Sequence, residues 1–459
     1  MLRRDFLAGC AAAGAIRAAG APRRPNFVFI LADDLGWSDP GCYGSKLHET
    51  PHLDRFAASA MRFTQAYAAC PVCSPTRTAI MTGKYPARVG LTDYLPGLQP
   101  KDRKLLSVKD LDGLPVSETT IAEALKAAGY RTFMRGKWHL GDDGPRMHGF
   151  DDADAAVSRR RDGTNRDQDM TAASVRFLET AGSQPFFLYL GFTYPHTPID
   201  AWKERVEHFR KKVAAMNFPA ERLAKERNGT TRLWQDNAEY ASILAAMDEN
   251  LGRLLRALSE RELDGNTVVI FASDNGGLCT HQNKDGGPTS NRPLRSGKGW
   301  CYEGGVRVPL IVRAPGVTRA GSTSDFATVS TDFFPTMLEL AGLPAMPRQH
   351  RDGLSLAGVL AGKPGPRRDA LYWHYPHYHG STWAPGAAVR AGDWKLIEFY
   401  DEEKVELYNL REDPGERNDL AAREPGRTKK LREQLAAWQK SVGANMAPRN
   451  PAWRGSAPG

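Results

Sequence analysis

The chain has 459 residues, of which 41% are hydrophobic and 25% are charged. These values are ordinary for a soluble globular enzyme, and they exclude a collagen-like, coiled-coil or disordered chain. The formal net charge of +9 suits a polyanionic partner but does not choose among sulfated glycan, nucleic acid and phospholipid. No Lys/Arg-rich run is interleaved with aromatic residues, so nucleic acid is not an expected partner.

The first 21 residues have the pattern of an export signal. A pair, Arg3-Arg4, precedes a short Ala-rich apolar stretch, which is similar to a twin-arginine signal, and Ala19-Gly20-Ala21 offers a small-x-small cleavage site. An ordinary N-terminal helix is the alternative. No later segment has the run of about 18 apolar residues that a membrane-spanning helix needs, so no stable membrane insertion is expected. We therefore expect an exported protein, periplasmic or extracellular in a bacterium.

Export would place the cysteines in a compartment that permits disulfides. Cys42, Cys70, Cys279 and Cys301 could pair in three ways, and the sequence does not choose among them. Free buried thiols are equally compatible with the sequence.

Apolar runs typical of buried strands alternate with amphipathic helical segments from residue 26 onward. The run 26–32 is continuously apolar and stops at Asp33-Asp34, as a strand buried on both faces of a parallel sheet does. Thr50 is a candidate N-cap for a helix through Met61. The further expected elements, in chain order, are helix 117–129, strand 130–134, helix 169–178, strand 186–190, helix 240–258, strand 267–272, strand 308–312 and helix 334–340.

This alternation predicts a doubly wound α/β fold, with a large, mixed and mostly parallel sheet flanked by helices. Residues 200–235 are charged and irregular, which indicates an insertion at the active-site face. Residues 275–299 form a long loop of the kind usually kept for function.

The composition changes near residue 363, where Pro364-Gly365-Pro366 breaks the chain. Short strands at 394–397 and 405–408 and a helix at 425–440 follow, and the Pro/Gly-rich end at 448–459 reads as loose. We therefore expect an export signal at 1–21, a catalytic domain at 22–362 and a smaller C-terminal α+β subdomain at 363–459. That subdomain, with a short antiparallel sheet and one helix, would complete the substrate cleft.

A candidate nucleophile, Cys73, lies at the expected start of a helix. Pro75 suits the first helical turn, because its missing N–H would be unsatisfied there anyway. Cys73 would then lie beside free backbone donors and the positive end of the helix dipole, with Arg77 one turn later on the same side. A nucleophile, a positive field and a cation at one spot predict attack on an anionic ester.

Two acidic pairs, Asp33-Asp34 and Asp274-Asn275, each close an expected strand. Ligands of open α/β sheets bind at the carboxyl ends of the strands. Four oxygen side chains arriving there favour a hard cation, Ca²⁺ or less plausibly Mg²⁺, over zinc. A solvated turn would explain one such pair, but two pairs beside a special cysteine favour a metal site.

Cys73-Ser74-Pro75-Thr76-Arg77, followed by Met-Thr-Gly-Lys, resembles the signature of type I sulfatases. Further segments resemble family motifs in order and content, and they span nearly the whole mature chain. They are Asp33-Asp34, Gly136-Lys137-Trp138-His139, Asp274-Asn275, Ser296-Gly297-Lys298-Gly299, Glu303 to Pro309, and the C-terminal Leu407-Tyr408-Asn409-Leu410 run.

The resemblance implies a fold of the alkaline phosphatase superfamily and an arylsulfatase-like sulfuric ester hydrolase. In that family the cysteine, here Cys73, is converted by a formylglycine-generating enzyme to 3-oxoalanine (formylglycine), which binds one Ca²⁺ together with the two acidic pairs. One hydroxyl of the hydrated aldehyde attacks sulfur, and the second later expels sulfate. By the same resemblance, Lys137 and Lys298 contact the sulfate or the modified residue. His139 is the base, and His196 or Lys298 protonates the leaving alcohol.

Two other functions are compatible with parts of this pattern. Related phosphodiesterases and phosphonate monoester hydrolases share the superfamily fold. A non-catalytic glycan-binding relative would lack at least one metal or charge-neutralising group, and none is missing here.

Export, positive charge and one aromatic segment favour a sulfated carbohydrate as the substrate over a lipid or steroid sulfate. The segment is Trp373-His374-Tyr375-Pro376-His377-Tyr378-His379, whose aromatic faces and His donors suit a sugar ring. His374 and His377 are therefore candidate substrate-binding residues, with a packed aromatic loop as the alternative. The particular sugar and sulfate position cannot be derived from these residues.

Overall fold

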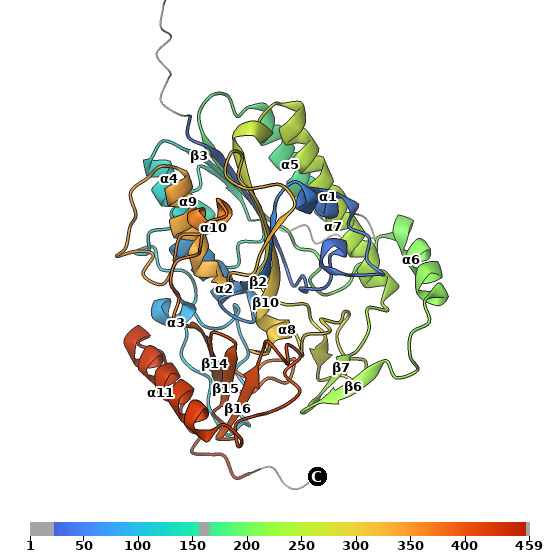
Figure 1. Cartoon of the computed structure of the whole chain (residues 1–459), viewed down its shortest axis with the longest axis vertical. Coiled ribbons are helices and arrows are strands. Elements are labelled where there is room, and N and C mark those ends of the chain that lie inside the picture. The colour runs from blue at the N-terminus through green and yellow to red at the C-terminus, as the bar shows by residue number, and fades with distance from the viewer. Residues whose placement is uncertain (1–22, 156–164, 166, 456–459) are drawn as a thin grey trace, which may run out of the picture.

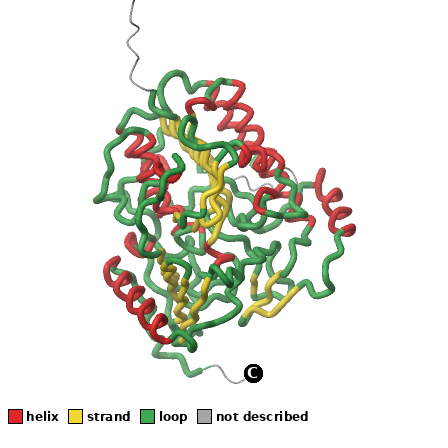
Figure 2. Tube along the Cα trace, viewed as in Figure 1, coloured by secondary structure: helices red, strands yellow, loops and turns green. Residues whose placement is uncertain are grey.

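A computed structural model describes residues 23–155, 165 and 167–455 of the chain. Its largest element is a nine-stranded sheet with strand order β11-β2-β10-β8-β1-β5-β3-β4, and β12 also pairs with β2. A four-stranded sheet, β13-β14-β15-β16, and a three-stranded sheet, β6-β7-β9, complete the strands (Figure 1 and Figure 2). The expected export signal at 1–21 lies outside the described residues.

The strands are β1 (Asn26–Ala32), β2 (Met61–Tyr67), β3 (Arg131–Gly136), β4 (Asp152–Asp154), β5 (Phe186–Gly191), β6 (Leu223–Glu226), β7 (Gly229–Arg232), β8 (Thr267–Ser273), β9 (Thr280–His281), β10 (Arg307–Arg313), β11 (Ser322–Ser324), β12 (Thr328–Val329), β13 (Leu371–Tyr375), β14 (Gly386–Ala391), β15 (Trp394–Phe399) and β16 (Lys404–Asn409). The α-helices are α1 (Pro51–Ala58), α2 (Cys73–Thr82), α3 (Pro86–Val89), α4 (Ile121–Ala127), α5 (Gln168–Glu179), α6 (Lys203–Ala215), α7 (Ala238–Glu260), α8 (Glu303–Val306), α9 (Phe333–Leu340), α10 (Ala357–Leu360) and α11 (Pro425–Val442).

The large sheet is mixed and mostly parallel, as the sequence predicts. β1 pairs in parallel with both β5 and β8, and all seven of its residues are buried. β10 is antiparallel to its neighbours β8 and β2. A strand with parallel partners on both sides has helices over both of its faces, which explains its uninterrupted apolar sequence.

Two hydrophobic layers cover the two faces of this sheet. Because side chains alternate along a strand, Phe27 and Phe29 of β1 enter one layer while Val28 and Ile30 enter the other. Helices α4, α9 and α10 cover the first face, and α1, α5 and α7 cover the second (Figure 1). This is the doubly wound arrangement expected from the sequence.

The C-terminal part forms an antiparallel sheet covered by one helix, as expected. Strands β13 to β16 pair in sequence order, and α11 packs on β14 and β15. Trp373 and Trp383 lie in a core with Trp438 of α11. This core also contains residues of the large domain, so the two parts share one packed interface.

Several local expectations differ from the structure. The helix expected to reach Met61 ends at Ala58, because Met61 begins β2, which pairs with β10. Residues 200–235 are not irregular: they contain α6, whose buried residue is Phe209, and the β6–β7 hairpin.

The chain end beyond α11 is also more ordered than expected. Asn450 donates hydrogen bonds to the carbonyl oxygens of Lys101 and Arg103, and Leu105 forms a β-bridge with Arg449. Residues 448–450 therefore hold the 101–106 loop in place. Within this chain end, residues 456–459 lie outside the described part.

The five cysteines in the described part of the chain are free thiols, so none of the three pairings among the four candidates is formed. Within the same residues, no helix has both the length and the apolar composition needed to cross a bilayer.

Candidate active site

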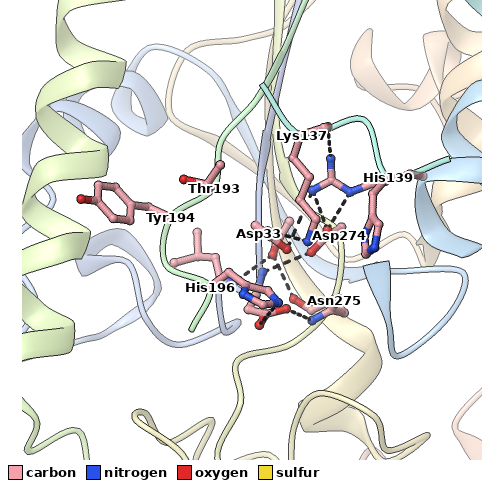
Figure 3. Close-up of polar contacts among 12 residues, drawn as sticks. Asp33, Lys137, His139, Thr193, Tyr194, His196, Asp274 and Asn275 are labelled. Carbon is pink, nitrogen blue, oxygen red and sulfur yellow. Dashed lines mark hydrogen bonds and ion pairs between the residues drawn. The ribbon is translucent and has the colours of Figure 1, made fainter. Parts of the chain in front are cut away.

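The two acidic pairs meet at the carboxyl ends of neighbouring strands. β1 and β8 are parallel, and Ala32 lies opposite Ser273, so the residues that follow them are adjacent. The backbone N–H of Asp34 donates to Asp274 Oδ1 at 3.1 Å, and Asn275 Nδ2 donates to Asp34 Oδ1 at 2.8 Å. Asp34 has φ of 65°, a left-handed conformation that Asp tolerates better than most residues. Figure 3 shows Asp33, Asp274 and Asn275 converging.

Cys73 is the first residue of α2 and is buried. Its neighbour Val72 is the extended N-cap residue, so Cys73 lies at the end of the helix where backbone N–H groups are free. The Sγ atom, one oxygen of Asp33 and one oxygen of Asp274 all lie within 4.8 Å of one another. Helix α2 therefore delivers Cys73 directly to the acidic pairs.

Arg77, one turn later, is fully buried and fixes this arrangement. Its Nε and one terminal nitrogen donate to Asp274 Oδ2 at 3.0 and 2.7 Å, and the other terminal nitrogen donates to the Lys137 carbonyl at 2.6 Å. Arg77 does not line the cavity described below. Arg77 therefore holds Asp274 and Lys137, the residue after β3, in place without contacting the cavity.

Two lysines pair with the first acidic pair. Lys137 Nζ lies 2.7 Å from Asp33 Oδ2, and Lys298 Nζ lies 2.8 Å from Asp34 Oδ2. Burial opposes ionisation of Asp33, but the positive charges of Lys137, His196 and Arg77 outweigh it and hold the pKa of Asp33 well below its usual range. Each of the two buried carboxylates therefore has a positively charged partner, as a buried ionic group requires.

Two histidines complete the cluster on opposite sides of it (Figure 3). His139 Nε2 lies 2.6 Å from the Leu95 carbonyl oxygen, and because that oxygen can only accept, Nε2 carries the hydrogen. Burial and the charge of Lys137 lower the pKa of His139 to about 3, so the ring is neutral with its lone pair on Nδ1. His196 Nε2 lies 3.7 Å from Asp34 Oδ2, and burial and the charge of Lys298 lower its pKa.

The oxygen cluster fits a hard cation. Asp33 Oδ1 and Asn275 Oδ1 are buried without a hydrogen-bond partner, and such orphaned oxygens need an explanation such as an ion. Burial and the charge of Asp33 raise the pKa of Asp274 to about 6, a penalty that a divalent cation would relieve. The oxygens of these four side chains suit Ca²⁺ or Mg²⁺ better than zinc.

The formal charges of the cluster lead to the same conclusion. Arg77, Lys137 and Lys298 offset the three carboxylates of Asp33, Asp34 and Asp274. The described cluster is therefore nearly neutral, and it would attract an anionic ester strongly only with an added cation.

The cluster opens into a cavity of about 1140 Å³. Asp33, Cys73, Lys137, His139, His196 and Lys298 lie in its wall. Further along, the wall is formed by residues of three other segments: Tyr94, Leu95, Leu98 and Arg103; His281 and Gln282; and Tyr378, His379 and Ser381. The loop at 276–299 thus carries both a charged residue of the cluster, Lys298, and part of the wall.

The two histidines proposed to bind substrate do not reach this cavity. His374 is buried on the face of β13 that packs against α11, and its Nε2 lies 2.9 Å from the Asn445 carbonyl oxygen. Its ring lies beside Tyr400 and Gln439 of α11. Burial lowers its pKa to about 4. His374 is therefore a packing residue, and its assignment to the substrate cleft is wrong.

His377 is buried against Thr92 Oγ1, 2.8 Å from Nε2. It faces a neighbouring cavity that also contains Asp93 and Asp110. The residues of the same aromatic run that line the main cavity are Tyr378 and His379, which belong to the segment expected at the cleft but were not chosen as its candidate substrate-binding residues. Strand β13 ends at Tyr375. The alternation of side chains along a strand therefore does not indicate which way the residues after Tyr375 point.

The chain is similar to known proteins over most of its length. The sulfatase family profile matches residues 25–343, and a profile described as N-sulphoglucosamine sulphohydrolase, C-terminal, matches residues 296–441. The chain is 31% identical to a sulfatase of Formosa agariphila, over 91% of this chain and 89% of the relative. It is 30% identical to human arylsulfatase A, over 91% and 87%. The crystal structure of Ps i-CgsB matches with a TM-score of 0.75 at 26% identity, over 94% of each chain.

The fold and site define a hydrolase of the alkaline phosphatase-like α/β class. Within that class the chain belongs to the type I sulfatase family, and it is a sulfatase that hydrolyses sulfate esters.

Proposed function

We propose that the protein removes sulfate from a sulfated carbohydrate through a formylglycine made from Cys73. The observation that carries this proposal is the place of Cys73. It is buried at the N-terminus of α2, in the wall of the cavity, with Asp33 and Asp274 beside it. Burial raises the pKa of the Cys73 thiol despite the nearby lysines, which argues against an ordinary thiolate nucleophile.

The metal site would be formed by Asp33, Asp34, Asp274 and Asn275, with residue 73 beside them. The two orphaned buried oxygens support this assignment. A bound Ca²⁺ would supply positive charge for the sulfate oxygens and for an oxygen of the modified residue. Mg²⁺ fits less well, because it demands a tighter octahedral geometry and usually keeps several waters.

Sulfate monoesters are anionic, so the protein must neutralise charge on the non-bridging oxygens. Lys137 and Lys298 line the cavity at its charged end and are suited to that task. Lys298 is buried, Lys137 is partly buried and both are held by carboxylates, so they are oriented before substrate arrives. Such preorganisation avoids reorientation during the reaction.

A formylglycine hydrate at residue 73 would supply one hydroxyl to attack sulfur as the alcohol leaves and a second whose deprotonation would release sulfate, which would split the reaction into two steps. His139 is suited to accept that proton at Nδ1, because the Leu95 carbonyl fixes the hydrogen on Nε2. His196 or Lys298 would protonate the leaving alcohol, since both lie in the cavity wall near Asp34.

Replacing His139 by alanine is expected to lower kcat by about 10²- to 10⁴-fold, the range for loss of a general base. The KM for an aryl sulfate should change much less, since His139 is not a charged sulfate ligand. Steady-state kinetics would measure both constants. His208→Ala, at an exposed histidine on α6, is the matched control. Full activity of His139→Ala would contradict the assignment.

Removal of the cation is expected to reduce activity by at least about tenfold, because the nearly neutral cluster that is left would no longer attract and polarise an anionic ester. The protein would be dialysed against a chelator, and activity and melting temperature compared before and after adding Ca²⁺ or Mg²⁺. Recovery with Ca²⁺ above that with Mg²⁺ is expected. Activity that is unchanged after the metal has been shown to be absent by elemental analysis would refute the site.

A phosphodiesterase or phosphonate monoester hydrolase is the principal alternative. Comparing kcat/KM for an aryl sulfate with that for an aryl phosphodiester would separate the two activities. The family match favours the sulfate ester.

A sulfated saccharide is the proposed substrate class. A structure of Ps i-CgsB in complex with k-i-k-neocarrahexaose, 26% identical with a TM-score of 0.74, supports it by analogy. Export to the periplasm or exterior, and maturation by a formylglycine-generating enzyme, belong to the same proposal. Sulfate release from a panel of defined monosulfated sugars is the experiment that tests it.

A further inference from the structure

The wall of the cavity beyond its charged end contains two histidines, His281 and His379. His281 ends β9, and His379 comes from the loop after β13 in the C-terminal subdomain. Both are partly exposed within the described structure. His379 lies against Gly299, the residue after Lys298, so it is next to the charged end of the cavity.

The hydrogen position on each ring is fixed by a backbone N–H. Ser381 N donates to His379 Nδ1 at 3.1 Å, and Asn283 N donates to His281 Nδ1 at 3.2 Å. A nitrogen that accepts a hydrogen bond carries the lone pair, so in each neutral ring the hydrogen lies on Nε2. Neither Nε2 has a hydrogen-bond partner among the described residues.

His379 is held rigidly against the loop that carries Lys298. Ser381 Oγ lies 2.8 Å from its Nδ1, and Tyr94 packs edge-on against the ring with centroids 5.6 Å apart. Gly299 has φ of +83°, and a Cβ there would lie 2.2 Å from His379 Nδ1. Only glycine lets the ring approach so closely, so the chain is built to hold His379 beside Lys298.

We propose that His379, assisted by His281, is a specificity-determining residue that donates a hydrogen bond from Nε2 to a hydroxyl or ring oxygen of the sugar carrying the scissile sulfate. This inference rests on the proposed function and names a subsite within it. Burial and the charge of Lys298 lower the pKa of His379 to about 3, so the ring is a neutral donor at the pH of an ordinary assay. An aryl sulfate has no oxygen in the equivalent position and cannot use the donor.

The test compares two substrates in the same variants. Wild type, His379→Ala and His379→Gln would be assayed with 4-nitrophenyl sulfate and with the best monosulfated methyl glycoside of the panel. Sites built around a hydrogen bond discriminate against ligands lacking it. We therefore expect His379→Ala to lower the sugar-to-aryl ratio of kcat/KM by about tenfold, the effect of one lost hydrogen bond to a neutral group.

Gln can place an amide N–H near the position of Nε2, so His379→Gln should recover part of the lost ratio, a result that a purely structural role would not give. His208→Ala is again the control, with the ratio unchanged. Melting temperatures would show whether each variant folds. If His379→Ala does not fold, the sugar-to-aryl ratio of kcat/KM is compared in His379→Gln and His281→Ala instead.

Equal losses with both substrates would overturn the inference, because they would indicate a role at the sulfate itself. A wild-type enzyme that hydrolyses the aryl sulfate and none of the sugars would overturn it too, while leaving the sulfatase assignment intact. Failure of wild type with both probes would instead contradict the proposed function.

Discussion

Replacing Cys73 by alanine should abolish sulfate release, with a loss of at least about 10³-fold in kcat, since covalent catalysis fails without its nucleophile. Alanine can be neither oxidised to an aldehyde nor hydrated. The substitution removes only one buried sulfur at the first residue of α2, so the fold should persist and the melting temperature should fall by a few degrees at most. An aryl sulfate assay and a thermal melt of the same preparation measure both effects.

Cys42→Ala is the matched control, because Cys42 is a free, partly exposed thiol that does not line the cavity. Mass spectrometry of the peptide containing residue 73 would then identify the catalyst. Active wild type should show the mass difference between CH2SH and CHO side chains. An unmodified cysteine in fully active protein, or a fully active Cys73→Ala variant, would refute the formylglycine proposal.

The position of the two acidic pairs could be predicted from sequence because it depends on a local rule. An apolar run followed at once by Asp33 or Asp274 marks a buried strand and its polar end, and parallel strands bring such ends to one edge. The same rule works for Lys137, which follows β3 directly. The helix start at Cys73 is equally local, since the N-terminal turn accommodates Pro75.

The interactions that orient these groups are not local, and the sequence could not reveal them. The Leu95 carbonyl that sets the His139 tautomer lies 44 residues away in the chain. His379 reaches the Lys298 loop from the C-terminal subdomain across 81 residues of sequence, and it depends on the packing of Gly299. No periodicity or spacing encodes such contacts, because they depend on how distant loops meet.

The error at His374 was, in contrast, avoidable. Side chains alternate along β13, and Trp373 and Tyr375 point toward the large domain, where they donate to the Ala68 carbonyl and to Asp93. Tyr372 stacks on Trp438 of α11, at 4.7 Å between ring centroids. His374 lies on the same face as Tyr372 and so must also face α11. Recognising 371–375 as a strand would have excluded it from the cleft.

The interface between the two parts of the protein contains a buried charge cluster whose disruption should have a large effect on stability. Lys395 of β15 is fully buried, with Nζ 2.9 Å from Glu303 Oε1 and 3.0 Å from Glu416 Oε1. Glu303 begins α8, directly after the loop that carries Lys298. Tyr67 also donates to Glu303 at 2.7 Å, and the Glu303 N–H donates to Glu416.

Burial disfavours the charged form of both carboxylates in this cluster. The nearby positive charges offset this effect at Glu303 but not at Glu416. Burial raises the pKa of Glu303, but the charges of Lys395, Arg307 and Arg390 together outweigh it and lower that pKa to about 2, whereas burial raises the pKa of Glu416 to about 7. Without the lysine, the pKa of Glu416 would rise further above its ordinary value of 4.5, while Glu303 would keep Arg307 as a partner. Glu416 would then have to be protonated, or remain as an uncompensated buried charge, in the folded protein.

Lys395→Met should therefore lower the free energy of unfolding by about 3–5 kcal/mol at pH 8, the usual penalty for breaking a buried ion pair. An acid whose folded pKa is raised destabilises the fold above its unfolded pKa and not below it, so the deficit should shrink as the pH falls toward 5. Denaturant unfolding of the variant and wild type at the two pH values measures this difference. A deficit that is absent at pH 8, or that grows on acidification, would contradict the electrostatic account.

Two further variants separate charge from packing. Lys429→Met, at an exposed lysine of α11, should change stability by less than about 1 kcal/mol, as expected for a surface ion pair. Lys395→Met combined with Glu303→Gln and Glu416→Gln should recover part of the loss, because neither carboxylate that paired with Lys395 is then left as a buried charge. Since Glu303 is only five residues from Lys298, partial loss of sulfatase activity in Lys395→Met, and its recovery in the triple variant, would show that this cluster also holds the catalytic loop in place.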